Sequence, residues 1–306
     1  MLDTMHSSTH FLKRDVLYDS EKPYSLRFTP PDGFARANIS IEKHEIEIRD
    51  IRPKMSTLNF QQDGIAILPF DSRMMYQDYD DEDIVREILL KEIANALKKF
   101  LGAQHVQIFE HTVRKRHETF PISTGEPYHY NQPTSIAHVD TTAEWAVAMA
   151  RQLNPTHTAA FTGGRNRIQC VKLWDQIMLK QIWRACSSFW KPITGPVRDW
   201  PLAMCDPKSL EPALDLEPCD LVYPDYVVEN RQVYFSERQR WMYLSDQMPN
   251  EAWVFMQADT DAKAGNPVAH TAFPVPGIGP AEVPPRESIE ARALVYYGGF
   301  EHEHQM

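Results

Sequence analysis

The second half of the chain carries short runs in which apolar residues alternate with polar ones or gather in groups of three to six, the pattern of β-strands. Proline-rich connections separate these runs. The predicted strands are Leu221–Tyr223, Tyr226–Val228, Val233–Phe235, Trp241–Leu244, Ala252–Gln257 and Ile289–Tyr297. Several short strands with frequent turn signals are typical of a jelly-roll sandwich or barrel.

The first half carries the helical pattern. Apolar residues recur at helical spacing over Asp80–Phe100, acidic residues occupy the first turn and Lys98 and Lys99 the last, so this segment predicts a helix that Gly102 caps. Its neighbours are an edge strand over Ile39–Ile51, a strand over Val106–Val113, and a helix from Thr142 to about Leu153.

These elements predict an α+β, mainly β fold: a double-stranded β-helix (jelly roll, cupin-like) flanked by helices. No linker divides the chain, so we expect one domain over residues 1–306. Residues 1–35 are polar and contain the turn signal Pro30–Gly33, so they are expected to wrap the surface. Residues 299–306 are expected to form a flexible tail.

Composition narrows the function classes. The 306 residues are 42% hydrophobic with a formal net charge of −10, which argues against a nucleic-acid surface. The one basic cluster, Arg114–His117, is short and fits a solvated turn or internal ion pairs. No run of 18 apolar residues and no apolar leader is present, and the four cysteines lack CxxC spacing, so we expect a cytoplasmic protein that contacts no membrane.

The candidate chemistry lies in Ser135–Thr142. His138 and Asp140 are two residues apart, so an extended strand points both side chains to one face. His270, 130 positions after Asp140, can complete the set. Two imidazoles and one carboxylate are the ligands of non-haem Fe(II) oxygenases, which leave other coordination positions open. An isolated HxD is a weak signal, so a structural role for these residues stays open at this point.

A second pattern comes after His270. Arg286 and Ser288 place a cation and a hydroxyl on alternate residues of a predicted strand, and Arg292 lies on the same face. An arginine fork binds a carboxylate in a fixed orientation. Together with the metal set, this order indicates an oxygenase that binds Fe(II), the cosubstrate 2-oxoglutarate and O2. Arg292 either shares the oxoacid with Arg286 or binds the substrate.

The ordered set of motifs also resembles a known family. Similar segments are Glu110–Arg114, His138–Thr142, Val197–Asp206, Arg240–Leu244, Pro249–Ala252, Val268–Phe273 and Arg286–Arg292. They resemble the fungal gibberellin-desaturase-like family, also described as the AsaB hydroxylase/desaturase family, of Fe(II)/2-oxoglutarate-dependent enzymes. The resemblance implies that His138, Asp140 and His270 hold the metal and that Arg286, Ser288 and Arg292 form the family's tail motif. It implies hydroxylation or desaturation of a small molecule in specialised (secondary) metabolism.

The chain departs from that family after Arg167–Trp174. The family runs from such a strand directly into a Trp-Arg-Pro-Ile type segment, here Trp190–Ile193, whereas about sixteen residues, 175–190, intervene in this chain. Their apolar content predicts a helical insertion on the surface. An alternative is a lid or dimer contact beside the active site, which leaves a homodimer open.

Five residues are candidates for the substrate pocket because aromatic side chains often line small-molecule sites: Tyr223, Tyr226, Arg240, Trp241 and Tyr243. The expected partner is a small-molecule substrate that the sequence does not identify. Two other functions remain open. One is a catalytically inactive β-helix binding protein whose site the insertion has spoiled, and the other is a cupin-type metal dioxygenase that does not use 2-oxoglutarate.

Overall fold

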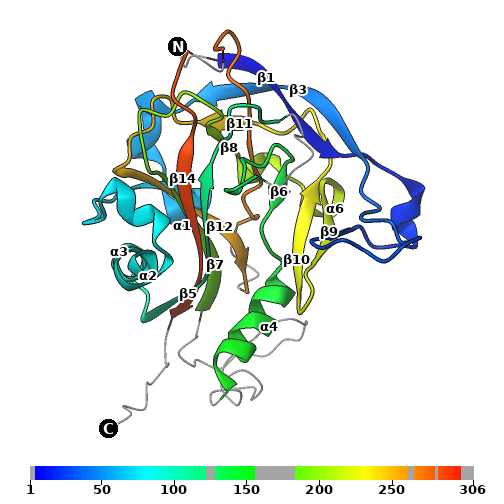
Figure 1. The fold of residues 1–306 in the computed structure, drawn as a ribbon, viewed down its shortest axis with the longest axis horizontal. Helices are drawn as coiled ribbons and strands as arrows, with labels where there is room; N and C mark the ends of the chain where they lie inside the picture. Colours follow the sequence, from blue (N-terminus) through cyan, green and yellow to red (C-terminus); the bar gives the residue numbers. More distant parts are fainter. Residues whose placement is uncertain (1–3, 122–127, 156–182, 261–264, 280–281, 298–306) are drawn as a thin grey trace.

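Two facing β-sheets form the body of the computed structural model, which describes residues 4–121, 128–155, 183–260, 265–279 and 282–297 (Figure 1). The strands are β1 (Thr4–Leu12), β2 (Tyr24–Leu26), β3 (Ile41–Asp50), β4 (Ile65–Pro69), β5 (His105–Lys115), β6 (His138–Val139), β7 (Trp183–Pro192), β8 (Leu202–Cys205), β9 (Leu216–Val222), β10 (Val227–Val233), β11 (Trp241–Tyr243), β12 (Glu251–Asp259), β13 (His270–Ala272) and β14 (Glu287–Tyr297).

The larger sheet has the order β1-β3-β11-β8-β13-β6-β10-β9-β2, and the smaller one β4-β12-β7-β14-β5. Besides pairing with β3, β1 bridges to Ile136 and Tyr234 through His10 and Leu12, so the nine-stranded sheet curls. This mainly β, jelly-roll-like architecture confirms the predicted fold class.

One helical run covers the outer face of the five-stranded sheet. The helices are α1 (Phe60–Asp63), α2 (Glu82–Ile84), α3 (Leu90–Leu101), α4 (Ala143–Leu153) and α6 (Pro212–Asp215), with a π-helical turn η4 (Val85–Leu89) and 3-10 turns η1 (Val16–Asp19), η2 (Arg52–Thr57), η3 (Tyr76–Asp80) and η6 (Pro207–Ser209). The α2–α3 run lies beside the smaller sheet in Figure 1, and Leu89, Ile93 and Leu97 pack into one core cluster with Phe189 and Val254.

The predicted helix ends are confirmed. Asp81 caps the start of the α2–α3 run by accepting hydrogen bonds from Asp83 N and Ile84 N, and Gly102 ends it with a φ of 66°, a conformation that favours glycine. Thr142 caps α4, where its hydroxyl accepts from Trp145 N at 3.1 Å. This cap lies two residues after Asp140, so the start of α4 fixes the backbone next to the candidate site.

Two predictions about the first residues need correction. Ile39–Ile51 does form a strand, β3, but β3 lies between β1 and β11 and is not an edge. The edge is β1, inside the segment that we expected only to wrap the surface. Its apolar residues Phe11 and Leu12 are fully buried, so this strand closes the curled sheet.

The predicted helical insertion over 175–190 is wrong for its second half. Residues 183–190 belong to β7, which pairs with β12 on one side and β14 on the other in the middle of the smaller sheet. The sequence of 183–190 mixes apolar and polar residues without strict alternation, so periodicity alone does not identify it as a strand. Residues 175–182 lie outside the described residues, as do the strand-like Arg167–Trp174 and the tail 299–306.

The structure also bears on the basic cluster and on the expected absence of membrane contact. Three basic residues of the Arg114–His117 cluster form ion pairs: Arg114 with Glu290, Lys115 with Asp80 and Arg116 with Asp199. This is the internal ion-pair role that the sequence left as one interpretation of the cluster.

In the described parts of the chain, no helix combines the length and apolar character that crossing a bilayer requires.

Candidate active site

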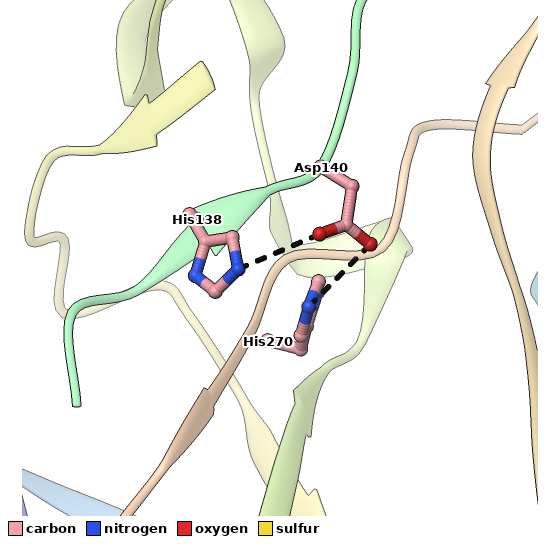
Figure 2. A group of neighbouring side chains, drawn as sticks. All are labelled: His138, Asp140 and His270. Carbon is pink, nitrogen blue, oxygen red and sulfur yellow. Dashed lines mark ion pairs between the residues drawn. The ribbon is translucent and has the colours of Figure 1, made fainter. Parts of the chain in front are cut away.

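His138, Asp140 and His270 converge between the two sheets. Their ligand atoms all lie within 4.8 Å of one another. His138 is on β6 and His270 on β13, where the two residues are directly paired across neighbouring strands. His138 Nε2 lies 3.6 Å from Asp140 Oδ1, and His270 Nε2 lies 3.7 Å from Asp140 Oδ2 (Figure 2). Residues 130 positions apart along the chain therefore share one point in the fold.

Both imidazoles present a nitrogen suited to a metal ion. His138 Nδ1 lies 2.8 Å from the carbonyl oxygen of Ile136, and His270 Nδ1 lies 3.4 Å from that of Val268. A carbonyl can only accept a hydrogen bond, so Nδ1 carries the proton and Nε2 keeps its lone pair. Burial lowers the pKa of His270 to about 4, so this imidazole is neutral at physiological pH. The donor set fits a divalent metal such as Fe(II).

The carboxylate of Asp140 is held at both oxygens. Arg292 Nη2 donates to Oδ1 at 2.8 Å, and the Ser188 hydroxyl donates to Oδ2 at 2.8 Å. Burial opposes the ionisation of this carboxyl group, but Arg292 and then His270 outweigh it, so the pKa of Asp140 lies well below its usual range. The site therefore contains a charged, oriented carboxylate.

A buried glutamine links the two metal-site strands. Gln257, on β12, is 1% exposed, and its side-chain oxygen accepts from the backbone N–H of Asp140. Its amide nitrogen donates to the carbonyl of Val268 at 3.1 Å, two residues before His270. The Gln257 side chain thus positions both Asp140 and the backbone two residues before His270.

Arg286 lies beside the metal site, directly before the strand that carries the predicted tail motif. A pocket is lined by His138, His270, Arg286, Arg114, Glu290 and Trp190, among others. Arg286 is 3% exposed, its Nη1 donates to the carbonyl of Trp200 at 2.6 Å, and its guanidinium lies 5.5 Å from the centre of a Trp190 ring. It therefore faces the same pocket as the imidazoles.

Among the residues that the structure describes, no carboxylate forms an ion pair with the Arg286 side chain, although Glu290 and Asp199 act on it from farther away. Burial, and next the neighbouring Arg114, lower the pKa of Arg286 to about 9. Its buried Nε has no hydrogen-bond partner among the described residues, and neither does the hydroxyl of the fully buried Ser288. Unsatisfied buried donors are costly, so the two residues form a site prepared for an acceptor such as a carboxylate.

Arg292 has the opposite surroundings. Besides Asp140 it pairs with Glu110 at 2.6 Å and lies 3.8 Å from Glu290. Burial alone would lower its pKa, but these carboxylates outweigh burial and raise it. Its donors are occupied by the protein, so Arg292 acts on Asp140 and is not available to a bound oxoacid in this arrangement.

The candidate substrate residues separate into two groups. Tyr223 and Tyr226 stack at 4.5 Å at the β9–β10 turn, with Tyr226 54% exposed. Burial, and next Tyr223, raise the pKa of Tyr226, with smaller contributions from Glu110 and Arg292. Tyr223 and Tyr226 therefore stay candidates for the substrate side.

Trp241 and Tyr243 point away from the face of the sheet that carries the imidazoles. Met204 pairs with both His270 and Met242, so Met242 shares the face of His270, whereas Trp241 and Tyr243 point to the other face. Trp241 is 2% exposed in the core of the curled sheet, and Tyr243 packs on Phe273. Arg240 is exposed. Trp241 and Tyr243 therefore pack in the hydrophobic core.

Sequence reasoning missed four residues that shape the site: Ser188, Gln257, Glu290 and Glu110. Ser188 lay inside the supposed insertion, and Gln257 sits in an apolar run where a polar residue was the only available signal. Glu290 receives two hydrogen bonds from Arg114, at 3.1 and 2.7 Å, which fixes the wall of the pocket. Alternation along residues 286–292 could have placed Glu290 on the inner face.

Comparisons with known proteins agree with this geometry. The profile of a family described as "Oxidoreductase/YMDC permease-like domain" matches residues 10–185 and 178–296. The chain is 29% identical over 277 residues to the Fe(II)/2-oxoglutarate-dependent dioxygenase nvfI of Aspergillus novofumigatus, with 89% of this chain and 90% of that protein covered.

Two further relatives widen the range of named activities. The hydroxylase/desaturase poxK of Penicillium oxalicum is 25% identical over 313 residues, with 91% and 88% covered. Aspirochlorine biosynthesis protein N of Aspergillus oryzae is 30% identical over 179 residues, 57% of this chain and 74% of the relative. Among solved structures, the iron and alpha-ketoglutarate-dependent endoperoxidase NvfI superimposes with a TM-score of 0.77 at 26% identity, covering 97% of this chain and 99% of that one.

Proposed function

This chain belongs to the oxidoreductase family whose relatives include fungal Fe(II)/2-oxoglutarate-dependent dioxygenases and hydroxylase/desaturases, and from that premise we propose that it hydroxylates or desaturates a small organic substrate. The observation that carries the proposal is the convergence of three ligand atoms within 4.8 Å. Beside them lies Arg286, whose guanidinium forms no ion pair with any described residue. A relative named for aspirochlorine biosynthesis supports a role in specialised metabolism.

Each residue of the site has a role in this proposal. His138, Asp140 and His270 would hold Fe(II) through two imidazole nitrogens and one carboxylate oxygen, leaving the opposite side open. Bound Fe(II) supplies the activation of O2, coupled to the conversion of 2-oxoglutarate to succinate and CO2. Arg292 and Ser188 keep the carboxylate of Asp140 ionised and oriented.

We assign the far carboxylate of 2-oxoglutarate to Arg286 and Ser288. Both side chains are buried and carry an unpaired donor, and the two residues lie at the start of the strand that lines the pocket. A carboxylate there would pair with the guanidinium in the bidentate geometry that arginine favours. Arg292 is excluded from this role because its donors already bind Asp140 and Glu110.

The substrate would enter on the side of Tyr223 and Tyr226. Hydroxylation and desaturation begin with removal of the same substrate hydrogen and differ only in the fate of the substrate radical, so the site residues do not separate them. The structural relative titled an endoperoxidase adds endoperoxide formation to the products that must be examined.

Loading of the purified protein with Fe(II) under anaerobic conditions tests the proposal. We expect about one iron per chain, a visible charge-transfer band on addition of 2-oxoglutarate, and succinate formation once O2 is admitted. Iron binding with no response to 2-oxoglutarate would favour the cupin-type dioxygenase. Failure to bind iron would leave the catalytically inactive binding protein.

Further expectations accompany this function. We propose that residues 1–306 act as one oxygenase domain and that the enzyme works in the cytoplasm. We leave the homodimer as a proposal, although residues 183–190 of the expected insertion belong to the smaller sheet. Size-exclusion chromatography with light scattering measures the oligomeric state, and a fluorescent fusion in a fungal host measures location.

A further inference from the structure

A second cavity lies on the outer face of the five-stranded sheet, opposite the metal site. Its volume is about 190 Å³, below the range of roughly 300–1,000 Å³ typical of drug-sized ligands. Phe70, Met74, Ile193 and Pro249 give it apolar walls, and Tyr79 and Lys191 add polar atoms. No step of the proposed oxygenase reaction uses this cavity.

Lys191 is an unusual residue at this position. On β7, Trp190 and Ser188 face the inner side of the sheet, so Lys191 points outward with Phe189, into the core beneath the helices. Lys191 is only 3% exposed. Lysine is almost never this buried unless its charge is paired, because burial removes the hydration of the ammonium group.

The Lys191 ammonium has one neutral partner. Its Nζ donates to the hydroxyl of Tyr79 at 3.1 Å and lies 5.4 Å from the centre of the same ring. Among the residues that the structure describes, no carboxylate forms an ion pair with it. The nearest acidic influence is Glu92, whose oxygens are taken by Ser72 at 2.6 Å and Arg73 at 2.7 Å. Within the described part of the chain, Lys191 is thus a buried cation without an ion-pair partner, and the one carboxylate that lines the cavity, Asp71, is exposed.

Two titration properties agree with this geometry. Burial lowers the pKa of Lys191 to about 8, and Glu92 opposes that shift only in part, so the amine still carries its charge at neutral pH. Burial, with smaller contributions from Glu92 and Asp78, raises the pKa of Tyr79 to about 12. The phenol therefore stays neutral and can donate its proton to an acceptor while it accepts from Lys191.

We propose that this cavity binds a small carboxylate with an apolar body. The carboxylate would pair with the Lys191 ammonium and accept a hydrogen bond from Tyr79, while Phe70, Met74 and Ile193 would cover its apolar part. Asp71 lies at the rim, where its charge disfavours ligands that bear a second carboxylate near the opening. The preferred ligand is therefore a monocarboxylate.

Calorimetric titration of the iron-loaded, full-length protein with sodium benzoate tests the proposal. Saturating 2-oxoglutarate, in the absence of O2, keeps the pocket of Arg286 occupied. We expect benzoate binding to the wild type, and binding at least about tenfold weaker in Lys191→Met. Lys208→Met is the matched control, because this lysine is exposed and lines neither pocket: benzoate should bind it as it binds the wild type.

A second variant guards against a folding defect in Lys191→Met. Met74→Trp fills the cavity from its half-buried wall and leaves the lysine intact, so it should also abolish benzoate binding. The thermal midpoint of each variant, measured without ligand, confirms that it is folded. The proposal is overturned if the wild type binds no benzoate at millimolar concentration, or if binding survives in both Lys191→Met and Met74→Trp.

Discussion

Two arginines, Arg286 directly before β14 and Arg292 within it, face the metal site in opposite electrostatic surroundings. Arg286 and Arg292 are six residues apart on one face, Arg286 is 3% exposed, and the Arg292 side chain is 16% exposed. At the Arg286 end the neighbouring arginine Arg114 has a larger effect than the carboxylates of Glu290 and Asp199, and the Arg286 Nε has no partner among the described residues. At the Arg292 end two carboxylates accept hydrogen bonds and a third lies close by.

This difference separates ligand binding from positioning. A buried cation without an anion is unstable until an anion arrives, so the Arg286 end is prepared for an exchangeable carboxylate. A cation that the protein has already paired cannot gain as much from a ligand. The Arg292 end is therefore built into the metal site through Asp140. Equivalent positions on a strand acquire different roles from the residues that the facing strands supply.

The largest effect should come from removing the carboxylate that connects Arg292 to the metal. Asp140→Ala deletes one of three proposed ligands and leaves Arg292 with one fewer anion. We expect loss of bound iron and a fall in turnover of roughly 10³-fold or more, equivalent to about 4 kcal/mol. Iron content by plasma mass spectrometry and succinate release measure the two effects. Full iron occupancy in this variant would remove Asp140 from the ligand set.

Arg286→Gln addresses the other end of the comparison. Loss of the guanidinium should raise the KM for 2-oxoglutarate by roughly 30- to 1,000-fold, about 2–4 kcal/mol, because a desolvated charge pair is lost. Iron content should stay at the wild-type level. The check is steady-state kinetics with varied 2-oxoglutarate, and Arg286→Lys should recover only part of the affinity. An unchanged KM would contradict the assignment.

Arg292→Gln should give the reverse profile. Residues that orient a metal ligand typically contribute roughly 10- to 100-fold to metal affinity or activity, so we expect iron affinity or kcat to fall by about that factor. The KM for 2-oxoglutarate should not change. Anaerobic Fe(II) titration and the same kinetic series measure both quantities. If the two arginine variants showed the same profile, the separation of roles along β14 would be wrong.

Ser288→Ala should have the smallest effect of these variants on the binding of 2-oxoglutarate. The buried hydroxyl has no partner within the described residues and would serve only the bound cosubstrate. One neutral hydrogen bond contributes about 1 kcal/mol, so the KM for 2-oxoglutarate should rise about fivefold. The thermal midpoint should fall little, since no hydrogen bond within the described part of the protein is lost. A large loss of stability with unchanged KM would make Ser288 a packing residue.

The sequence allowed some parts of this structure to be predicted because they depend on local spacing. The period of two puts His138 and Asp140 on one face, and the α2–α3 run arises from its apolar stripe and its Gly102 cap. These features need only neighbouring residues to form. Trp241 and Tyr243 show the limit of that reasoning, because which face of a strand meets the site depends on the partners of the strand.

The amino-acid sequence by itself determined the ligand types, the order of the motifs and the mainly β architecture. Only the tertiary structure decided that β7 is a central strand, that Ser188 and Gln257 fix Asp140, and that Arg292 rather than Arg286 forms ion pairs within the described part of the chain. The physical reason is that alternation assigns side chains to a face, whereas charge pairing between faces arises from strands far apart in the chain.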